Sequence, residues 1–269
     1  MTRKRLGVPS SAGVGACLAL LALGLLACVS PVAPQRPLSR DAAVALWDGW
    51  REQVADRRTL RCSARLAVDG EGTRLRAKQR MAVALPSRLR VEIQGFLGTT
   101  AGVLTVDQGE YAFLQGEPRV FESGPVDDAL LARVVAVDLS PELVVEVLLG
   151  APEQASDYAV SGGVYTAAGL REVRLEAGRA ARFDSEGRLR AYQVATSDAA
   201  PGWQAGFEDY ALVDGAPVAH RLTLAVGQGT RAVLILRDIE LNPALSPDIF
   251  RLDGFGPEAG SAGVGVEGG

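Results

Sequence analysis

Apolar and polar side chains alternate along much of this chain, a period of two that is typical of β-strands with one buried face. The first such segment has apolar residues at even positions from Leu60 to Val68 and mostly polar ones between them. Turn residues such as Asp214-Gly215 separate the segments and favour hairpins. We therefore expect strands over residues 60–69, 74–85, 88–94, 99–107, 109–115, 118–122, 158–161, 171–177, 180–184, 188–197, 203–212, 217–226 and 230–241.

Three other segments have the period of an α-helix. Ser39 is a favourable N-cap for a helix that runs to about residue 56. The apolar face of this helix consists of Ala43, Leu46, Trp47, Trp50 and Val54. Residues 127–136 begin with acids, which suit a helix N-terminus. Residues 140–149 have Ser140 as a cap, Pro141 in the first turn and Gly150 just beyond the end.

These elements predict a mainly β fold with some α-helix, namely an incomplete antiparallel β-barrel of about 11 strands with a helical plug. The plug consists of the N-terminal helix and the helix pair inserted between strands. A sheet of this length must curl or close, and the strongly apolar helices can cover its concave side. We expect Trp47, Trp50, Leu143 and Val147 to form the plug or line the cavity beneath it. A curled sheet covered in this way can contain an apolar ligand.

The N-terminus has the pattern of a secretion signal. It begins with Arg3-Lys4-Arg5, continues through an apolar stretch and ends in Leu25-Leu26-Ala27-Cys28. A cysteine directly after the cleavage site resembles the signal of bacterial lipoproteins, which implies that Cys28 becomes the acylated first residue. The alternatives are a plain secretory signal or an uncleaved anchor, although the apolar stretch is shorter than the roughly 20 residues of a membrane span.

The chain divides into four predicted parts. Residues 1–27 are the lipoprotein signal peptide, and residues 28–38, rich in proline, are a lipidated tether. Residues 39–253 form the folded domain. Residues 254–269 are nearly half glycine and are expected to be a disordered tail.

Composition narrows the chemistry. The formal net charge is −4, and removal of residues 1–27, with three basic residues and no acid, lowers it to −7. An acidic chain argues against nucleic acid as a partner. With Cys28 acylated, Cys62 has no disulfide partner, and its strand position predicts a buried, unreactive thiol. One histidine and one remaining cysteine do not suffice for a typical zinc site, and no metal or cofactor is expected.

Several motifs resemble one protein family. Gly95-Phe96-Leu97-Gly98 joins two predicted strands and resembles a hairpin of the LolB family, the outer-membrane receptors of bacterial lipoprotein localisation. Further similar segments follow in the same order, namely 147–152, Asp157-Tyr158, Trp203, Asp209-Tyr210 and Pro217. Asn242-Pro243 and Phe250 are more similar to periplasmic LolA-type carriers and their lipoprotein relatives. The chain thus resembles the LolA/LolB-like superfamily over about residues 60–253, with Phe96 where LolB proteins have proline.

The resemblance implies a half-open barrel with helices in its mouth, in a lipoprotein of the outer membrane that faces the periplasm. Such a protein binds the acyl chains of lipoproteins and helps to insert them into that membrane. The implied partners are acylated lipoproteins or lipid, a periplasmic LolA-like carrier and the outer membrane, and we expect a monomer. Phe96 and Leu97 would form a membrane-insertion loop, or a tight turn whose leucine folds back onto the core. Val29, where an aspartate would retain some lipoproteins in the inner membrane, favours the outer membrane by analogy.

The sequence leaves other interpretations of its basic residues, its histidine and its function open. The basic row Arg74, Arg76, Lys78 and Arg80 fits either anionic head groups or an acidic carrier, or is simply the solvated face of a strand. His220 lies in an alternating strand without a nearby nucleophile motif, so we do not expect an enzyme. The alternative functions are a structural or docking envelope lipoprotein of the same fold, and a carrier of other lipids.

Overall fold

The computed structural model describes residues 36–70, 73–95, 99–116, 119–127, 129–135, 137–197, 202–227 and 229–252. The described residues belong to one compact unit. The predicted signal peptide, Cys28, Phe96, Leu97 and the glycine-rich tail all lie outside the described ranges. Within those ranges, no helix combines the length and the apolar character that crossing a bilayer requires.

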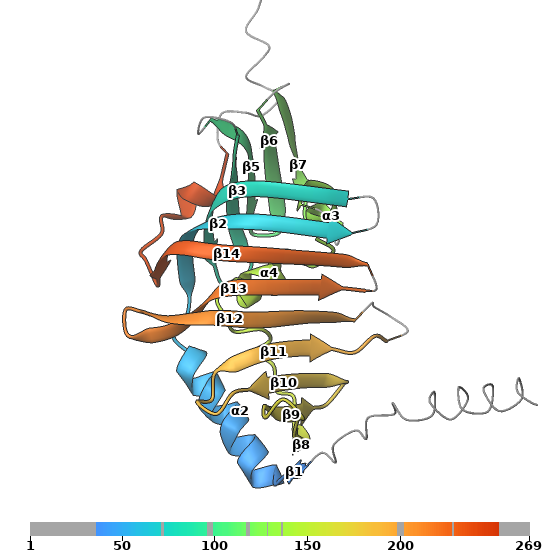
Figure 1. Ribbon diagram of the computed structural model, residues 1–269. Helices are drawn as coiled ribbons and strands as arrows, with labels where there is room; N and C mark the ends of the chain where they lie inside the picture. The colour runs from blue at the N-terminus through green and yellow to red at the C-terminus, as the bar shows by residue number, and fades with distance from the viewer. Residues whose placement is uncertain are drawn as a thin grey trace, which may run out of the picture. The chain divides into compact units, whose positions relative to one another are not determined.

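Among the described residues, fourteen strands form a single antiparallel sheet (Figure 1). In chain order they are β1 (Arg36–Leu38), β2 (Thr59–Gly70), β3 (Thr73–Ala84), β4 (Arg88–Gln94), β5 (Thr100–Asp107), β6 (Glu110–Gln115), β7 (Val120–Pro125), β8 (Val160–Tyr165), β9 (Arg171–Leu175), β10 (Arg179–Phe183), β11 (Leu189–Val194), β12 (Trp203–Val213), β13 (Ala216–Val226) and β14 (Thr230–Leu241). The order in space is β1-β8-β9-β10-β11-β12-β13-β14-β2-β3-β4-β5-β6-β7. Because β1 and β7 are opposite edges, the sheet is open. The predicted incomplete antiparallel barrel is confirmed, with 14 strands rather than about 11.

The sheet consists of two meanders joined by one long-range pairing. Strands β2 to β7 follow one another in space as in sequence, and so do β8 to β14. The last strand, β14, then pairs with β2, which places Leu234 directly opposite Leu66. This pairing brings residues from the two ends of the domain onto one continuous surface.

The predicted helix caps are present. Helix α2 (Arg40–Val54) begins after Ser39, whose hydroxyl accepts a hydrogen bond from the Ala42 N–H at 3.3 Å. Helix α4 (Pro141–Leu148) begins after Ser140, whose hydroxyl accepts from the Leu143 N–H at 3.3 Å. These caps satisfy backbone donors that a helix leaves unpaired at its first turn. Two shorter helices, α3 (Leu130–Val135) and the 3₁₀ helix η2 (Pro247–Phe250), complete the described structure.

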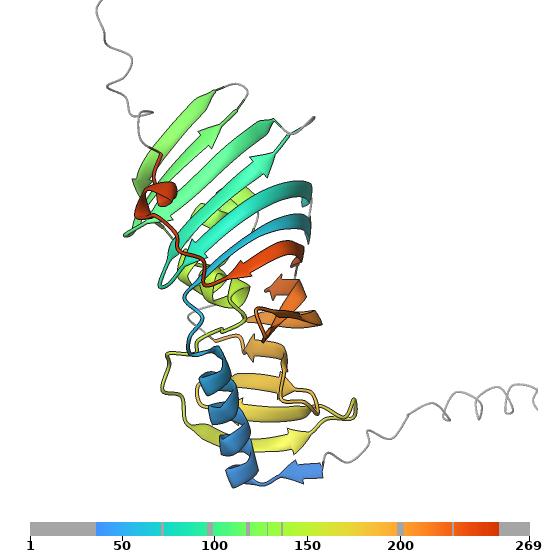
Figure 2. The same ribbon diagram turned by 90° about the vertical axis from the view of Figure 1, so that its left-hand side faces the viewer.

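Figure 2 shows helix α2 (blue) lying along the strands at the β1 end of the sheet. Helices α2 and α4 lie on the same face of the sheet, which we call the inner face. Strand register shows this, because one row of directly opposed residues crosses β11, β12, β13, β14 and β2. The row consists of Tyr192, Ala205, Leu224, Ala232 and Val68. Trp47 of α2 packs against Tyr192, and Val147 of α4 lines the same cavity as Leu224. Helix α2 contacts β8 and β9, whereas α4 contacts β3 and β4.

The sheet begins earlier than the sequence pattern indicates. Residues 36–38, which we expected to end the tether, form the edge strand β1 and pair with Gly163–Tyr165 of β8. Pro37 is tolerated there because an edge strand needs hydrogen-bond donors on one side only. Strand β1 has only three residues and is held by backbone hydrogen bonds. Three residues are too few to show an alternation of apolar and polar side chains, so the sequence pattern could not predict this strand.

The segment that follows β14 crosses the opposite, outer face of the sheet. The Asn242 side chain accepts a hydrogen bond from the Arg58 N–H at 2.8 Å. Phe250 is fully buried against Ala82 and Ala84, which face outward on β3. Two residues that contributed to the family resemblance, Asn242 and Phe250, therefore secure this segment to the sheet.

Candidate functional site

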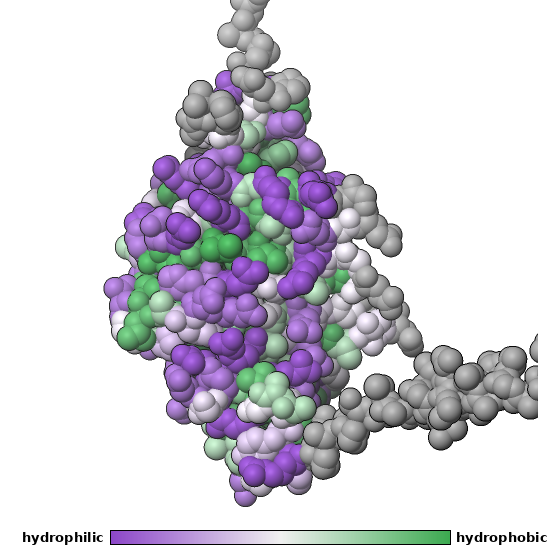
Figure 3. Space-filling model, viewed as in Figure 1, coloured by the Kyte–Doolittle hydropathy of each residue, from purple (hydrophilic) through white to green (hydrophobic). Residues whose placement is uncertain are grey.

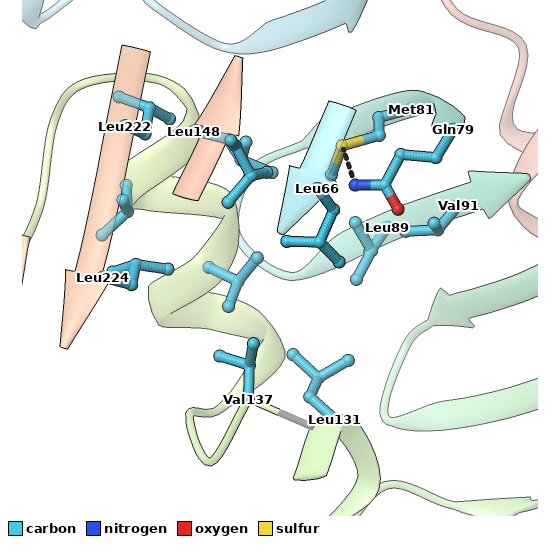
Figure 4. A pocket seen from close by; sticks show the side chains of 13 residues that line it. Leu66, Gln79, Met81, Leu89, Val91, Leu131, Val137, Leu148, Leu222 and Leu224 are labelled. Atoms are coloured by element: carbon cyan, nitrogen blue, oxygen red, sulfur yellow. Dashed lines mark hydrogen bonds between the residues drawn. The ribbon is translucent and has the colours of Figure 1, made fainter. Parts of the chain in front are cut away.

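An apolar cavity lies between the inner face of the sheet and the helix pair α3–α4 (Figure 4). Its walls come from β2, β3, β4, β13, β14, both helices and Val137, which lies between the two helices in sequence. The lining residues are Leu66, Gln79, Met81, Leu89, Val91, Leu131, Val137, Val144, Val147, Leu148, Leu222, Leu224 and Leu234. All of them except Gln79 are apolar. The cavity has a volume of about 50 Å³.

The local sequence explains why these side chains converge. On β2, β3 and β4, alternation directs Leu66, Met81 and Val91 to the inner face, and each is buried. On α4, Val144, Val147 and Leu148 are spaced three and four residues apart and therefore share one side of the helix. Sheet and helix thus contribute complementary halves of one apolar chamber.

Gln79 is the exception in this chamber. Its side chain is 3% exposed, and its Nε2 donates to the thioether sulfur of Met81 at 3.3 Å (Figure 4). A thioether is a weak hydrogen-bond acceptor, so this contact recovers little of the free energy lost when an amide leaves water. The position of Gln79 in the alternating pattern predicts that it faces inward, but its polar character gave no reason to assign it to a cavity.

Arg57 connects the end of α4 to the sheet. Its Nη1 donates to the Leu149 carbonyl at 2.8 Å, and its Nη2 donates to the Pro217 carbonyl at 2.7 Å. The residue is 5% exposed, and burial lowers the pKa of its guanidinium. Gly150, with φ +68°, allows the chain to turn directly beside this side chain. Sequence reasoning missed Arg57, because a charged residue in a loop ordinarily indicates solvent.

The two predicted tryptophans lie elsewhere on the inner face. Trp47 and Trp50 have ring centroids 4.7 Å apart, and they pack against Tyr192 and Phe183 with centroids 6.4 and 6.2 Å away, respectively. Both are almost fully buried, but neither lines the cavity. Trp47 and Trp50 therefore hold α2, one of the predicted plug helices, against the sheet.

The remaining predicted site residues differ in their positions. Val147 lines the cavity and is 1% exposed. Leu143 is partly buried against the core but is not part of the cavity wall. Phe96, Leu97 and Cys28 lie outside the described residues.

The chemistry of the described residues is that of an apolar chamber. Cys62 is buried as predicted, and burial, with a smaller contribution from Asp238, raises the pKa of its thiol to about 12. A thiol with such a high pKa is protonated and unreactive at neutral pH. Within the described ranges, no group of three or more His, Cys, Asp or Glu side chains could hold a metal ion.

Comparison with known proteins extends this description. No family model matches the sequence, and no curated protein sequence matches it. Solved structures do match. A LolA superfamily protein from Nitrosomonas europaea has 11% sequence identity and a TM-score of 0.50, over 80% of this chain and 99% of that one. A DUF1329 family protein from Desulfovibrio piger has 12% identity and a TM-score of 0.52, over 79% of this chain and 97% of that one.

At such low identity these similarities establish the fold alone. The predicted resemblance to the LolA/LolB-like superfamily is confirmed at that level.

Proposed function

The domain has the fold of the LolA/LolB-like superfamily, and on that premise we propose that it is a lipoprotein of the bacterial envelope that binds acyl chains. In its specific form, the proposal is an outer-membrane receptor, anchored through Cys28 and facing the periplasm. It accepts acylated lipoproteins from a periplasmic LolA-like carrier and inserts them into the outer membrane. We propose that it acts as a monomer and without a cofactor.

The observation that carries the proposal is the composition of the cavity wall. Twelve of its thirteen lining residues are apolar and none is charged. Removal of each methylene group from water contributes about 0.8 kcal/mol, so an acyl chain of about 16 carbons represents on the order of 12 kcal/mol. Only a continuous apolar surface can offset so large an unfavourable term when such a chain leaves a bilayer.

The cavity is much smaller than a usual ligand pocket, so it must enlarge before an acyl chain can bind. Ligand pockets in proteins usually enclose about 300–1,000 Å³, whereas this cavity encloses about 50 Å³. The described conformation therefore encloses too little space for an acyl chain. Binding requires α3 and α4 to move away from the sheet, which exposes the apolar residues of both layers together.

Release into the membrane is assigned to the loop between β4 and β5. Under this proposal Leu97, with Phe96 beside it, enters the bilayer while the acyl chains leave the cavity. An apolar loop tip suits this role because exposed apolar side chains commonly mark interaction sites. A docking lipoprotein of the same fold, which never binds a ligand, is the competing function.

Dye binding tests whether the cavity opens for a ligand. The chain from Val29 onward, purified without its acyl anchor, is titrated with an environment-sensitive hydrophobic dye, and palmitate is then added as a competitor. We expect saturable binding and displacement of the dye. Val147→Asp places a carboxylate in the cavity wall and is expected to abolish binding. Leu212→Asp changes a side chain that is 75% exposed on β12 and serves as the matched control.

The outcome separates the two functions. Absence of saturable binding by the folded wild-type chain would favour the docking role. Equal binding by both aspartate variants would show that the dye occupies another site. Mass spectrometry of lipid that co-purifies with the domain then identifies the class of ligand.

A further inference from the structure

Five basic side chains on the outer face of β14, β2 and β3 form a surface that we call the outer basic surface. Its members are Arg65, Lys78, Arg80, Arg231 and Arg237, and all are exposed. Within the described residues, no carboxylate lies within ion-pair distance of any of them. Figure 3 views this face, where hydrophilic residues gather over the three strands with hydrophobic ones between them. On a chain with a formal net charge of −4, such a concentration of unpaired positive charge is local.

The strand register places like charges directly opposite one another. Arg65 of β2 faces Lys78 of β3, and on its other side it faces Ile235 of β14, which is 37% exposed. Like charges directly opposed on neighbouring strands destabilise a sheet. Arg74 and Arg76 differ, because both lie near Asp69, with nitrogen–oxygen distances of 3.7 and 2.9 Å. Arg65 and Lys78 therefore repel each other in the folded sheet, and an anion bound between them would relieve this repulsion.

The outer basic surface extends to the side of the sheet at which β4 ends. In an antiparallel sheet alternate strands run in the same direction, so β13, β2 and β4 all end at one side of the sheet. Lys78 is directly opposite Gln94, the last residue of β4, and the loop that contains Leu97 begins immediately afterwards. Arg231 lies at the start of β14, on that same side. Basic side chains therefore lie at the end of the sheet where β4 ends, three residues before Leu97 in the sequence.

We propose that the outer basic surface binds the phosphate groups of anionic phospholipids in the membrane to which the protein delivers its cargo. The inference rests on the proposed function, since it assumes a protein that works at a bilayer. Each basic side chain close to an anionic membrane strengthens association about fivefold. Arginine and lysine at head-group depth would hold the end of the sheet at the bilayer while the apolar loop enters it. Ile235, between the charges, adds a small apolar contact.

Vesicle flotation tests this surface without involving the cavity. The acyl-free chain from Val29 is mixed with vesicles of phosphatidylcholine alone, or with about one third phosphatidylglycerol. We expect binding to the anionic vesicles that is at least about a hundredfold tighter and that weakens as salt shortens the Debye length. Arg65→Glu combined with Lys78→Glu should abolish this preference. Arg65→Gln combined with Lys78→Gln, which keeps the fold free of new repulsion, should reduce it about 25-fold.

A matched control excludes a general effect of net charge. Arg40 begins α2 and Arg58 precedes β2; both are exposed, and within the described residues neither side chain has an ionic partner. Arg40→Glu with Arg58→Glu alters the net charge equally and should leave binding unchanged. The proposal would be overturned if both double glutamate variants lost binding to anionic vesicles equally. It would also be overturned if the wild type showed no preference for anionic vesicles. Dye binding by the same preparations is an independent readout, so failure of the cavity function is distinguishable from failure of this surface.

Discussion

Arg57 donates a hydrogen bond of 2.8 Å from its Nη1 to the carbonyl of Leu149, the C-cap residue of α4. Its second nitrogen reaches the Pro217 carbonyl at the start of β13. One buried side chain thus connects the helix that covers the cavity to a strand that forms its wall. The adjoining Gly150 leaves just enough room, since a Cβ there would lie 2.8 Å from Arg57 Nη1.

Gly150→Ala should therefore destabilise the domain more than a positive φ alone explains. The left-handed backbone costs an alanine about 1 kcal/mol, and displacement of Arg57 adds at least about 1 kcal/mol more. Gly109→Ala is the matched control, because Gly109 also has a positive φ, +83°, but has open space around its Cβ position. Urea denaturation of both variants measures the difference. An equal decrease in the free energy of unfolding of both variants would show that Arg57 does not constrain this turn.

Gln79→Leu should stabilise the domain by about 1 kcal/mol, because it removes a buried amide whose described partner is a thioether. The new side chain matches the other residues of the cavity wall, so dye binding should persist. Gln204→Leu, at an exposed position on β12, is the control and should change stability by less than about 0.5 kcal/mol. Thermal unfolding of the three proteins gives the comparison. A loss of stability in Gln79→Leu would indicate that the amide has a structural role.

Leu97→Glu should fold normally and bind the dye, yet fail to release acyl chains into a membrane. A carboxylate at the loop tip opposes entry into the bilayer, whereas the cavity wall stays unchanged. Transfer of a fluorescent acylated peptide from the protein to vesicles measures release. Leu212→Glu, an exposed leucine on β12, is the control and should transfer at the wild-type rate. Normal transfer by Leu97→Glu would remove the membrane-insertion role of this loop.

Glu172 of β9 should make stability depend on pH. Burial acts to raise the pKa of its carboxyl, but hydrogen bonds from Arg182 and Arg174, at 2.9 and 3.1 Å, outweigh burial and hold the pKa below its usual range. The unfolded chain then binds a proton more readily than the folded one. The contribution of Glu172 is present above the pKa of an unfolded glutamate, about 4.3, and disappears as the pH falls through the lower folded-state pKa.

The measurement is urea denaturation of Glu172→Gln as a function of pH. The variant should have a lower free energy of unfolding than the wild type near neutral pH. The difference between the two free energies should become smaller below about pH 4. Glu176→Gln, at an exposed position in the next turn, is the control and is expected to have the same stability as the wild type at each pH. A constant gap at every pH would show that Glu172 contributes through packing instead of charge.

Local sequence was sufficient to predict most of the secondary structure. The alternation from Leu60 to Val68 corresponds to β2, whose even-numbered residues are buried. Ser39 and Ser140 marked the starts of α2 and α4 because a side-chain cap acts within three residues. Side-chain alternation and capping are short-range effects, so they are visible in the sequence. The edge strand β1 carries neither signal and was missed.

The cavity depends on contacts that no local pattern contains. Leu66 and Leu234 face each other only because β14 pairs with β2, more than half the chain away in sequence. The same sequence pattern was compatible with Trp47 inside the cavity or against the sheet, and packing on Tyr192 decided between them. Arg57 acquired its role when folding enclosed it between the Leu149 and Pro217 carbonyls.

The sequence by itself determined which residues are strands and helices and which faces are apolar, because period and capping are properties of neighbouring residues. Tertiary structure alone decided that the apolar faces of β2–β4, β13, β14 and α4 enclose one chamber, and that this chamber measures about 50 Å³. The reason is that pairing between distant strands and the fit of side chains across layers depend on the whole chain at once.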